Sequence, residues 1–317
     1  MAGKRSNNAL TRFATLEEVL SNEFMSINKV LDSITVQYSL PDHTALNRER
    51  FPWSNGLLSV PSFYASRMWE YPFAILSGDL RLGLKCLDIG CGMTPFTIYL
   101  KQVAKSGIVG LDPDLFASGV KYGCHGVSKE FVERTGLQIE QGGIENIPFP
   151  SESFDRVFCL SVIEHLGSDI IRKGATEIAR VLRHDGRAVI TVDVNLLSEL
   201  SRPLDIVWDS GLIPFGAIDL RWPFKRFGIF CDNKQPADVF GMTLVKPSDY
   251  YVETSYGGAR GRRIHGTLAP TLRKPPTSFI VQKRLRSMYQ KFPRPVRWLA
   301  KKIYRAMRRY YVERDCK

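Results

Sequence analysis

Two acidic residues and a pair of glycines carry the most distinctive chemistry of this 317-residue chain. Asp88, Gly90 and Gly92 share a turn that follows one apolar run, and Asp112 ends the next apolar run. Glycines in a strand-to-helix turn let a ligand approach the main chain closely. A carboxylate at position 88 would repel a diphosphate and attract an ammonium group, and one at position 112 can accept both hydroxyls of a ribose.

The residues at the end of this turn indicate which of two classes of ligand the turn could bind. A dinucleotide turn has the pattern G-x-G-x-x-G, which would place a third glycine at position 95, where this chain has proline. Thr94 and Pro95 instead match an N-cap followed by the first residue of a helix. An adenosine ligand with a cationic amino-acid end and no phosphates satisfies both the acids and the proline. S-adenosylmethionine is such a ligand.

Strand-like and helix-like segments alternate around the turn. Apolar runs predict strands at 85–89, 108–112, 137–141, 154–160 and 188–193, with two later ones at 249–254 and 277–284. Amphipathic patterns predict helices at 95–105, 115–123 and 169–182. This alternation predicts an α/β fold with a doubly wound, mostly parallel sheet, whose ligand lies at the carboxyl ends of the strands.

Four segments resemble, in order and spacing, the motifs of class I S-adenosylmethionine-dependent methyltransferases, with a methyltransferase type 11-like domain. They are LDIGCG, VGLDPD, QGGIENIPFPSESFDRVFCLSVIEHL and EIARVLRHDGRAVITVD. The resemblance covers about residues 84–193. It implies a Rossmann-like sheet of seven strands, a methyl-transfer activity and S-adenosylmethionine as the cofactor.

The resemblance also implies that nine residues contact the cofactor: Asp88, Gly90, Cys91, Gly92, Asp112, Ile144, Glu145, Leu160 and Ser161. The first four belong to the turn at the methionine end, and the fifth would bind the ribose. The next two would flank the adenine, and the last two would lie beside the sulfonium and its methyl group. Gly143 stands where many relatives have an aspartate that binds the adenine amino group, so backbone, Glu145 or water must supply that contact.

His165 is the candidate catalytic base, which a hydroxyl or protonated-amine acceptor requires. The segment IEHL follows the fourth strand of the domain and places an imidazole near the carboxyl edge of the sheet. The alternative is that His165 packs against the following helix, since relatives with very different acceptors share this Glu-His pair. Glu164 fits a structural role. Asp193 is a second candidate for contact with the acceptor, with helix or turn capping as the alternative.

The composition of the chain argues against several other kinds of site and segment. The six cysteines include no C-x-x-C pair, so neither a zinc site nor a disulfide framework is expected, and no metal is predicted. No apolar run approaches the roughly 20 residues that span a bilayer. The first 20 residues lack the apolar segment of a secretory signal, so we expect the protein in the cytoplasm.

The net charge of +12 is concentrated at the C-terminal end. Residues 273–317 contain 15 lysines and arginines against two acidic residues, which leaves the rest of the chain near neutral. Residues 288–311 place apolar residues at helical spacing among basic ones, which predicts a helix that binds an anionic membrane surface. The protein would then be peripheral on the inner face of the membrane. Nucleic acid is the next partner by this reasoning, and a docked helix with a solvated basic face is the third interpretation.

The expected organisation is a helical N-terminal extension at 1–59, a methyltransferase domain at 60–284 and the basic amphipathic C-terminal helix at 285–317. Within the domain, the aromatic and proline-rich residues 195–246 predict a packed insertion on the acceptor side. The segment SFYASRMWEYPFAIL (62–76) is expected to close over the donor or to join the core.

The sequence points to a hydroxyl acceptor. The WEYPF segment resembles that of methyltransferases found with bacterial surface-glycan enzymes. We therefore expect O-methylation of a sugar, a glycolipid or another small or lipid-linked acceptor. An RNA ribose methyltransferase and a non-catalytic S-adenosylmethionine-binding module are the alternatives. The segment LSVIEH replaces the Asn/Asp-Pro-Pro-Tyr type of motif, which argues against methylation of a base amine.

Overall fold

The computed structural model of the chain describes residues 9–50, 60–116, 120–121, 124–194, 206, 209–219, 230–232 and 235–247. The chain separates into two compact units, Met1–Gly257 and Gly258–Lys317. All described residues lie in the first unit. The predicted basic helix at 285–317 and the strands expected at 249–254 and 277–284 therefore lie outside the described residues.

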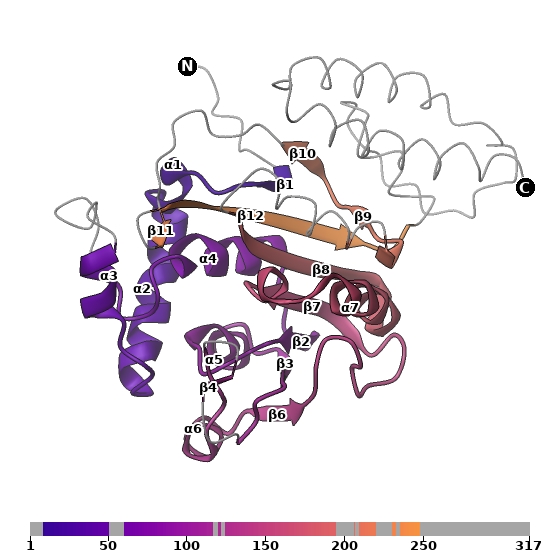
Figure 1. The fold of residues 1–317 in the computed structure, drawn as a ribbon, viewed down its shortest axis with the longest axis horizontal. Helices are drawn as coiled ribbons and strands as arrows, with labels where there is room; N and C mark the ends of the chain where they lie inside the picture. Colours follow the sequence, from indigo (N-terminus) through magenta and orange to yellow (C-terminus); the bar gives the residue numbers. More distant parts are fainter. Residues whose placement is uncertain are drawn as a thin grey trace, which may run out of the picture. The chain divides into compact units, whose positions relative to one another are not determined.

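A mixed sheet of ten strands forms the centre of the first unit, in the order β10-β1-β12-β8-β7-β2-β3-β6 with β9 and β11 paired to β12 (Figure 1). Five consecutive strands of this order are β8 (Leu182–Val194), β7 (Phe154–Leu160), β2 (Lys85–Ile89), β3 (Gly107–Asp112) and β6 (Gln138–Gln141). They pair in parallel, which confirms the predicted α/β class. The chain runs outward from β2 in one direction through β3 and β6, and in the other through β7 and β8. The strand order therefore reverses between β2 and β7.

The sheet extends further beyond β8 than the seven strands expected. The added strands are β12 (Gln235–Val245), β1 (Ala9–Phe13), β10 (Ala217–Asp219), β9 (Ile213–Pro214) and β11 (Phe230–Asp232). β12 is antiparallel to β8, and β1 is antiparallel to β12. β12 belongs to the segment expected to be an irregular insertion, and residues 239–245 are buried throughout. A strand covered on both faces has no polar alternation by which a sequence reveals it.

Three helices connect the parallel strands along the chain. They are α5 (Pro95–Gln102), α6 (Lys129–Thr135) and α7 (Ser168–Val181). α6 begins where the hydroxyl of Ser128 accepts the N–H of Phe131 (3.1 Å) and ends at Gly136, whose φ is +57°. The helix expected at 115–123 is wrong in its described part, because β4 (Val120–Lys121) there pairs with β5 (Cys124–His125). Each of these strands has two residues, which is too short for its alternation to be told from a helical pattern.

The N-terminal part of the chain folds as helices α1 (Leu16–Val19), α2 (Asn22–Gln37), α3 (Thr44–Arg50) and α4 (Arg67–Ser77). Thr15 and Glu18 form the hydrogen-bonded box that begins α1: the N–H of Glu18 donates to the Thr15 hydroxyl (3.3 Å), which donates to the Glu18 carboxylate (3.2 Å). Within the described ranges, no helix combines the length and the apolar character needed to cross a membrane.

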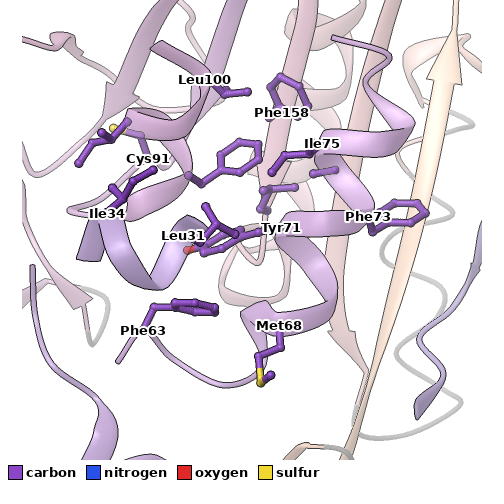
Figure 2. Close-up of a cluster of buried hydrophobic side chains, with 14 of the residues drawn as sticks. Leu31, Ile34, Phe63, Met68, Tyr71, Phe73, Ile75, Cys91, Leu100 and Phe158 are labelled. Carbon is purple, nitrogen blue, oxygen red and sulfur yellow. The ribbon is translucent and has the colours of Figure 1, made fainter. Parts of the chain in front are cut away.

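Helix α4 is held by an aromatic cluster between α2 and the sheet. Figure 2 shows Tyr71 among buried side chains from α2, α4, α5 and β7. Tyr71 stacks on Phe96 with ring centroids 5.3 Å apart, and Phe96 meets Phe158 of β7 edge-on at 5.2 Å. A Cβ at Gly241 of β12 would lie 2.5 Å from Phe73, so the glycine is what lets α4 lie flat on this strand. The aromatic residues of this segment therefore serve mainly as core, and they fix where the first turn of α4 lies.

Candidate functional site

The turn after β2 takes a shape that only glycines accommodate easily. Gly90 has a φ of +67° and Gly92 a φ of +52°. A Cβ at Gly90 would lie 2.5 Å from a methyl group of Val162, which belongs to the loop after β7. The loops that follow β2 and β7 therefore meet at this glycine. This is the point of strand-order reversal, where open α/β sheets bind their ligands.

The backbone N–H groups of the turn point into the protein. The N–H groups of Gly90 and Cys91 donate to the carbonyl of Leu111, at 2.7 and 3.4 Å. The N–H of Gly92 donates to Oδ2 of Asp112 at 3.0 Å. A phosphate-binding turn instead directs its N–H groups at the ligand. This arrangement supports the phosphate-free ligand inferred from Pro95.

Asp88 is a buried acid at the end of β2. It is 3% exposed, and its Oδ2 accepts the hydroxyl of Thr97 on α5 at 2.6 Å. Burial, opposed by the Thr97 hydrogen bond and reinforced by the nearby Asp112, raises the pKa of Asp88 to about 7. Such a carboxyl gains a great deal from a cation placed beside it, because the cation offsets the unfavourable burial of its charge.

Asp112 ends β3 beside the same turn. It is 8% exposed, and its Oδ1 accepts the N–H of Asp114 at 2.9 Å. Burial raises the pKa of Asp112, and the N–H groups of Asp114 and Gly92 partly counter that rise. Each carboxylate oxygen thus accepts one backbone N–H and keeps a second lone pair for a ligand hydroxyl. The structure brings Asp88, the two glycines and Asp112 together, as the sequence predicts.

Two of the residues expected to contact the cofactor have side chains that point into the protein. Cys91 is 2% exposed, and its sulfur lies 2.7 Å from where a Cβ at Gly110 of β3 would be. Burial raises the pKa of the Cys91 thiol well above its ordinary value. Ile144 is 4% exposed and packs against Gly174 of α7. These side chains support the two loops, and any ligand contact at these positions would come from the backbone.

Glu145 occupies the space left by the missing side chain at position 143. A Cβ at Gly143 would overlap the carboxylate of Glu145. A side chain from position 145 thus reaches the place where an aspartate at position 143 would project. Of the three sources considered for the adenine contact, this arrangement favours Glu145.

The carboxyl ends of β7 and β8 hold a second buried polar group, centred on Glu70 of α4. Glu70 is fully buried, and its Oε1 accepts hydroxyl hydrogen bonds from Ser161 and Thr191, each at 2.6 Å. Its Oε2 accepts the guanidinium of Arg67, one turn earlier, and the same guanidinium donates to the Ser161 hydroxyl. Although burial opposes the charge of Arg67, Glu70 and other nearby acids raise the pKa of the guanidinium above its ordinary value.

Ser161, the first residue after β7, is held in an unusual conformation by these contacts. Its φ is +49°, in the left-handed region that non-glycine residues rarely adopt. The N–H of Ser161 donates to the carbonyl of Thr191 at 3.0 Å, and its side chain is fixed by Glu70 and Arg67. Leu160, the last residue of β7, is 9% exposed. Arg67 was not predicted from the sequence; its signal is a charged pair with i, i+3 spacing in an otherwise apolar helix.

Three further titratable groups gather at the same edge. Glu164 and His165 lie in the short 3₁₀ helix η2 (Ile163–His165), and Glu164 accepts the N–H of Asp193 at 3.2 Å. Burial, together with the nearby Asp193 and Glu70, raises the pKa of Glu164 to about 8. Glu164 therefore ties η2 to the end of β8, in line with the structural role expected. Burial and the positive charge of Arg67 lower the pKa of His165, which favours the neutral imidazole.

The loop that leads into α4 is anchored by two side chains from preceding helices. The amide of Asn47 donates to the carbonyls of Pro61 and Phe63, and its oxygen accepts the N–H of Ala65 at 3.0 Å. The carboxylate of Asp32 accepts the N–H and the hydroxyl of Ser62. These bonds fix the chain immediately before Arg67.

Comparison with known proteins gives a match over the parallel strands and the turn after β2. A family model described as "Methyltransferase domain" matches residues 87–190, from β2 to β8. Residues 87–190 therefore form a methyltransferase domain. The cofactor of the domain is S-adenosylmethionine, and the residues fit it: the turn offers buried carboxylates for a cation and a ribose and turns its N–H groups away from the ligand. No cluster of His, Cys, Asp or Glu suited to a metal ion occurs among the residues that the structure describes.

Several curated proteins are similar to parts of the chain. A "tRNA U34 carboxymethyltransferase" of Campylobacter curvus is 26% identical over 164 residues, which are 50% of this chain and 52% of the relative. The "Uncharacterized methyltransferase YcgJ" of Bacillus subtilis is 36% identical over 123 residues, which are 37% of this chain and 43% of the relative. The chain thus spans about half the length, or less, of the curated relatives it matches.

The crystal structure of the Bacillus subtilis YcgJ protein is similar over 56% of this chain and 98% of that protein, with 17% identity and a TM-score of 0.38. A TehB-like methyltransferase from Corynebacterium glutamicum is similar over 65% of this chain and 98% of that protein, with 17% identity and a TM-score of 0.41.

Proposed function

We propose that the chain transfers the methyl group of S-adenosylmethionine to a hydroxyl of a sugar, a glycolipid or another small or lipid-linked acceptor. The observation that carries this proposal is that two clusters of polar side chains lie at one edge of the sheet. One group consists of Asp88 and Asp112, at the ends of β2 and β3. The other consists of Ser161 and His165, which follow β7, and Asp193, near the end of β8. The first group suits the donor and the second suits an acceptor that must lose a proton.

S-adenosylmethionine supplies an activated methyl group, so positioning and exclusion of water account for much of the catalysis asked of the protein. Asp88 attracts the ammonium of the amino-acid end, and Asp112 accepts the ribose hydroxyls. Leu160 and Ser161 border the place where transfer occurs. Their burial keeps that side of the site free of water.

His165 is proposed to take the proton of the acceptor hydroxyl. It lies in η2, directly after the loop that meets Gly90, and its lowered pKa keeps the imidazole neutral and able to accept a proton. Asp193, at the end of β8, is the second candidate for contact with the acceptor.

An RNA acceptor is the second candidate function. The observation that favours it is the similarity of half of this chain to proteins named tRNA U34 carboxymethyltransferase. The basic segment 273–317 suits either an anionic membrane surface or RNA phosphates. We propose that it binds the inner face of the membrane, where a lipid-linked acceptor would be found, and that the protein is otherwise cytoplasmic.

The test is to incubate the full chain with methyl-labelled S-adenosylmethionine and cell extract separated into lipid, polysaccharide, RNA and small-molecule fractions. Label in the lipid, polysaccharide or small-molecule fraction supports O-methylation of a hydroxyl if it survives alkali, which cleaves methyl esters, and is released as methyl iodide by hydriodic acid, which cleaves methyl ethers. Label in RNA alone supports the second candidate. Absence of donor binding by calorimetry would contradict both.

A further inference from the structure

Glu70 has the hydrogen-bond contacts of an ionised carboxylate, on a helix that apolar packing already holds against the sheet. It accepts donors from Ser161, Thr191 and Arg67, and none of its surface is exposed. Burying an ion pair rarely adds to stability compared with apolar side chains of the same size. Helix α4 already packs through Trp69 and Phe73, whose rings stack 4.5 Å apart. The buried pair therefore calls for a functional explanation.

The position of Glu70 relative to the donor follows from the topology. Asp112 lies at the end of β3, on one side of β2, and Ser161 follows β7, on the other. If the ribose lies on Asp112, a ligand that crosses the turn after β2 brings its amino-acid end and sulfonium toward β7. Glu70 is one hydrogen bond from Ser161 at that place. This step rests on the function proposed above.

The charges of Arg67 and Glu70 do not cancel at this place. The side chain of Arg67 is 20% exposed, whereas that of Glu70 is not exposed at all. Solvent therefore screens the guanidinium more effectively than the carboxylate. The other acids that face the pair are Glu164 on η2, which its raised pKa keeps protonated at neutral pH, and Asp193 on β8. Glu70 and Asp193 together outweigh the single positive charge of Arg67, so the field at the end of β7 is negative.

We propose that Glu70 is a specificity-determining residue of the donor site, which favours the positively charged sulfonium of S-adenosylmethionine over the neutral thioether of S-adenosylhomocysteine. Arg67 has the opposite effect on this preference, and it fixes the carboxylate in place. Methyl transfer removes the positive charge from the sulfur, so the product loses the attraction that held the donor. Glu70 in this way helps the product to leave after transfer.

The test compares the affinities of the full chain for S-adenosylmethionine and S-adenosylhomocysteine by calorimetry. Glu70→Gln keeps the shape of the side chain and an oxygen for the hydroxyls of Ser161 and Thr191, but it removes the negative charge and leaves Arg67 uncompensated. We expect it to weaken the binding of S-adenosylmethionine about tenfold more than that of S-adenosylhomocysteine. Arg67→Gln should change the ratio of the two affinities in the opposite direction. The double variant should fall between the two single variants.

Two controls separate this effect from a general loss of structure. Glu18→Gln disrupts another Arg-Glu pair that contacts α4, through Arg12 and Trp69, and should leave the ratio of affinities unchanged. Asp88→Asn should weaken the two ligands equally, because both carry the amino-acid ammonium.

Equal weakening of the two ligands by Glu70→Gln, or no weakening of either, would overturn the proposal. If circular dichroism shows that Glu70→Gln does not fold, Arg67→Gln decides the question: an unchanged ratio overturns the proposal, and a ratio shifted toward S-adenosylmethionine supports it. A wild-type protein that binds neither ligand would contradict the donor assignment itself, and this inference with it.

Discussion

Replacing Asp88 by asparagine should make the folded protein more stable at pH 8 and at the same time weaken its affinity for S-adenosylmethionine. Asp88 is 3% exposed, and its one described hydrogen bond to a side chain comes from Thr97. Asparagine has nearly the same shape, and its oxygen can still accept that hydroxyl. The substitution therefore removes the ionisable group with little change in packing.

The magnitude follows from the pKa of Asp88, which burial raises from its ordinary value of 3.8 to about 7. For an acid with a raised pKa, stability is unaffected below pH 3.8 and is lost as the pH rises toward 7, because the unfolded chain ionises first. The full rise corresponds to about 4 kcal/mol. Most of that loss falls above pH 5. We expect the stability advantage of Asp88→Asn over the wild type to grow by about 2–3 kcal/mol between pH 5 and pH 8.

The assay is urea denaturation of both proteins, followed by tryptophan fluorescence, at a series of pH values. Asp169→Asn is a matched control, because the side chain of Asp169 is 88% exposed and its replacement should give no pH-dependent difference. Calorimetry with S-adenosylmethionine completes the test: wild-type affinity should fall as the pH drops below 7, whereas the affinity of the variant should be lower and nearly independent of pH. A stability difference that stays constant from pH 5 to pH 8 would refute the reasoning.

Four further outcomes are expected. Gly90→Ala should cost about 2 kcal/mol or more in thermal or urea unfolding, whereas Gly83→Ala, also at positive φ but with open space around it, should cost only about 1 kcal/mol. Asn47→Ala should cost about 2–3 kcal/mol, because three hydrogen bonds are lost, and hydrogen exchange should increase in the loop before α4. His165→Gln should slow methyl transfer about 100-fold with donor affinity unchanged, and wild-type activity should persist to lower pH than an ordinary imidazole allows. Deletion of residues 288–317 should abolish sedimentation with anionic liposomes while donor binding remains; liposome binding equal to the wild type would contradict the membrane proposal.

The sequence was informative where local chemistry decides the structure. The shape of the turn at Asp88, Gly90 and Gly92 is predictable, because a turn that must combine an acid with two positive φ angles has few possible sequences. The place of Asp112 beside this turn follows from its position at the end of the next strand. Ile144 was assigned to the adenine, but its side chain packs on α7. A sequence motif places a residue in a loop, whereas the direction of its side chain depends on the helix that covers that loop.

The remaining features depend on contacts between distant parts of the chain. The role of Glu70 follows from its bonds to Ser161 and Thr191, which lie more than 90 residues later. Strand β1 has a short sequence, ALTRF, with no clear alternation, and it is a strand because β12 provides its partner. Pairing of this kind is set by tertiary structure, which overrides local propensity.

The pairing of β1 with β12 also sets an order on the assembly of the protein during synthesis. Thr11 pairs with Met242, so this strand leaves the ribosome more than 200 residues before its partner exists. The parallel strands from β2 to β8 can pair in the meantime, while the backbone of β1 remains unpaired. β1 can join the sheet only when β12 arrives, because β12 lies between β1 and β8. A nascent chain that stalls before β12 would therefore carry the complete turn after β2 on an unfinished sheet.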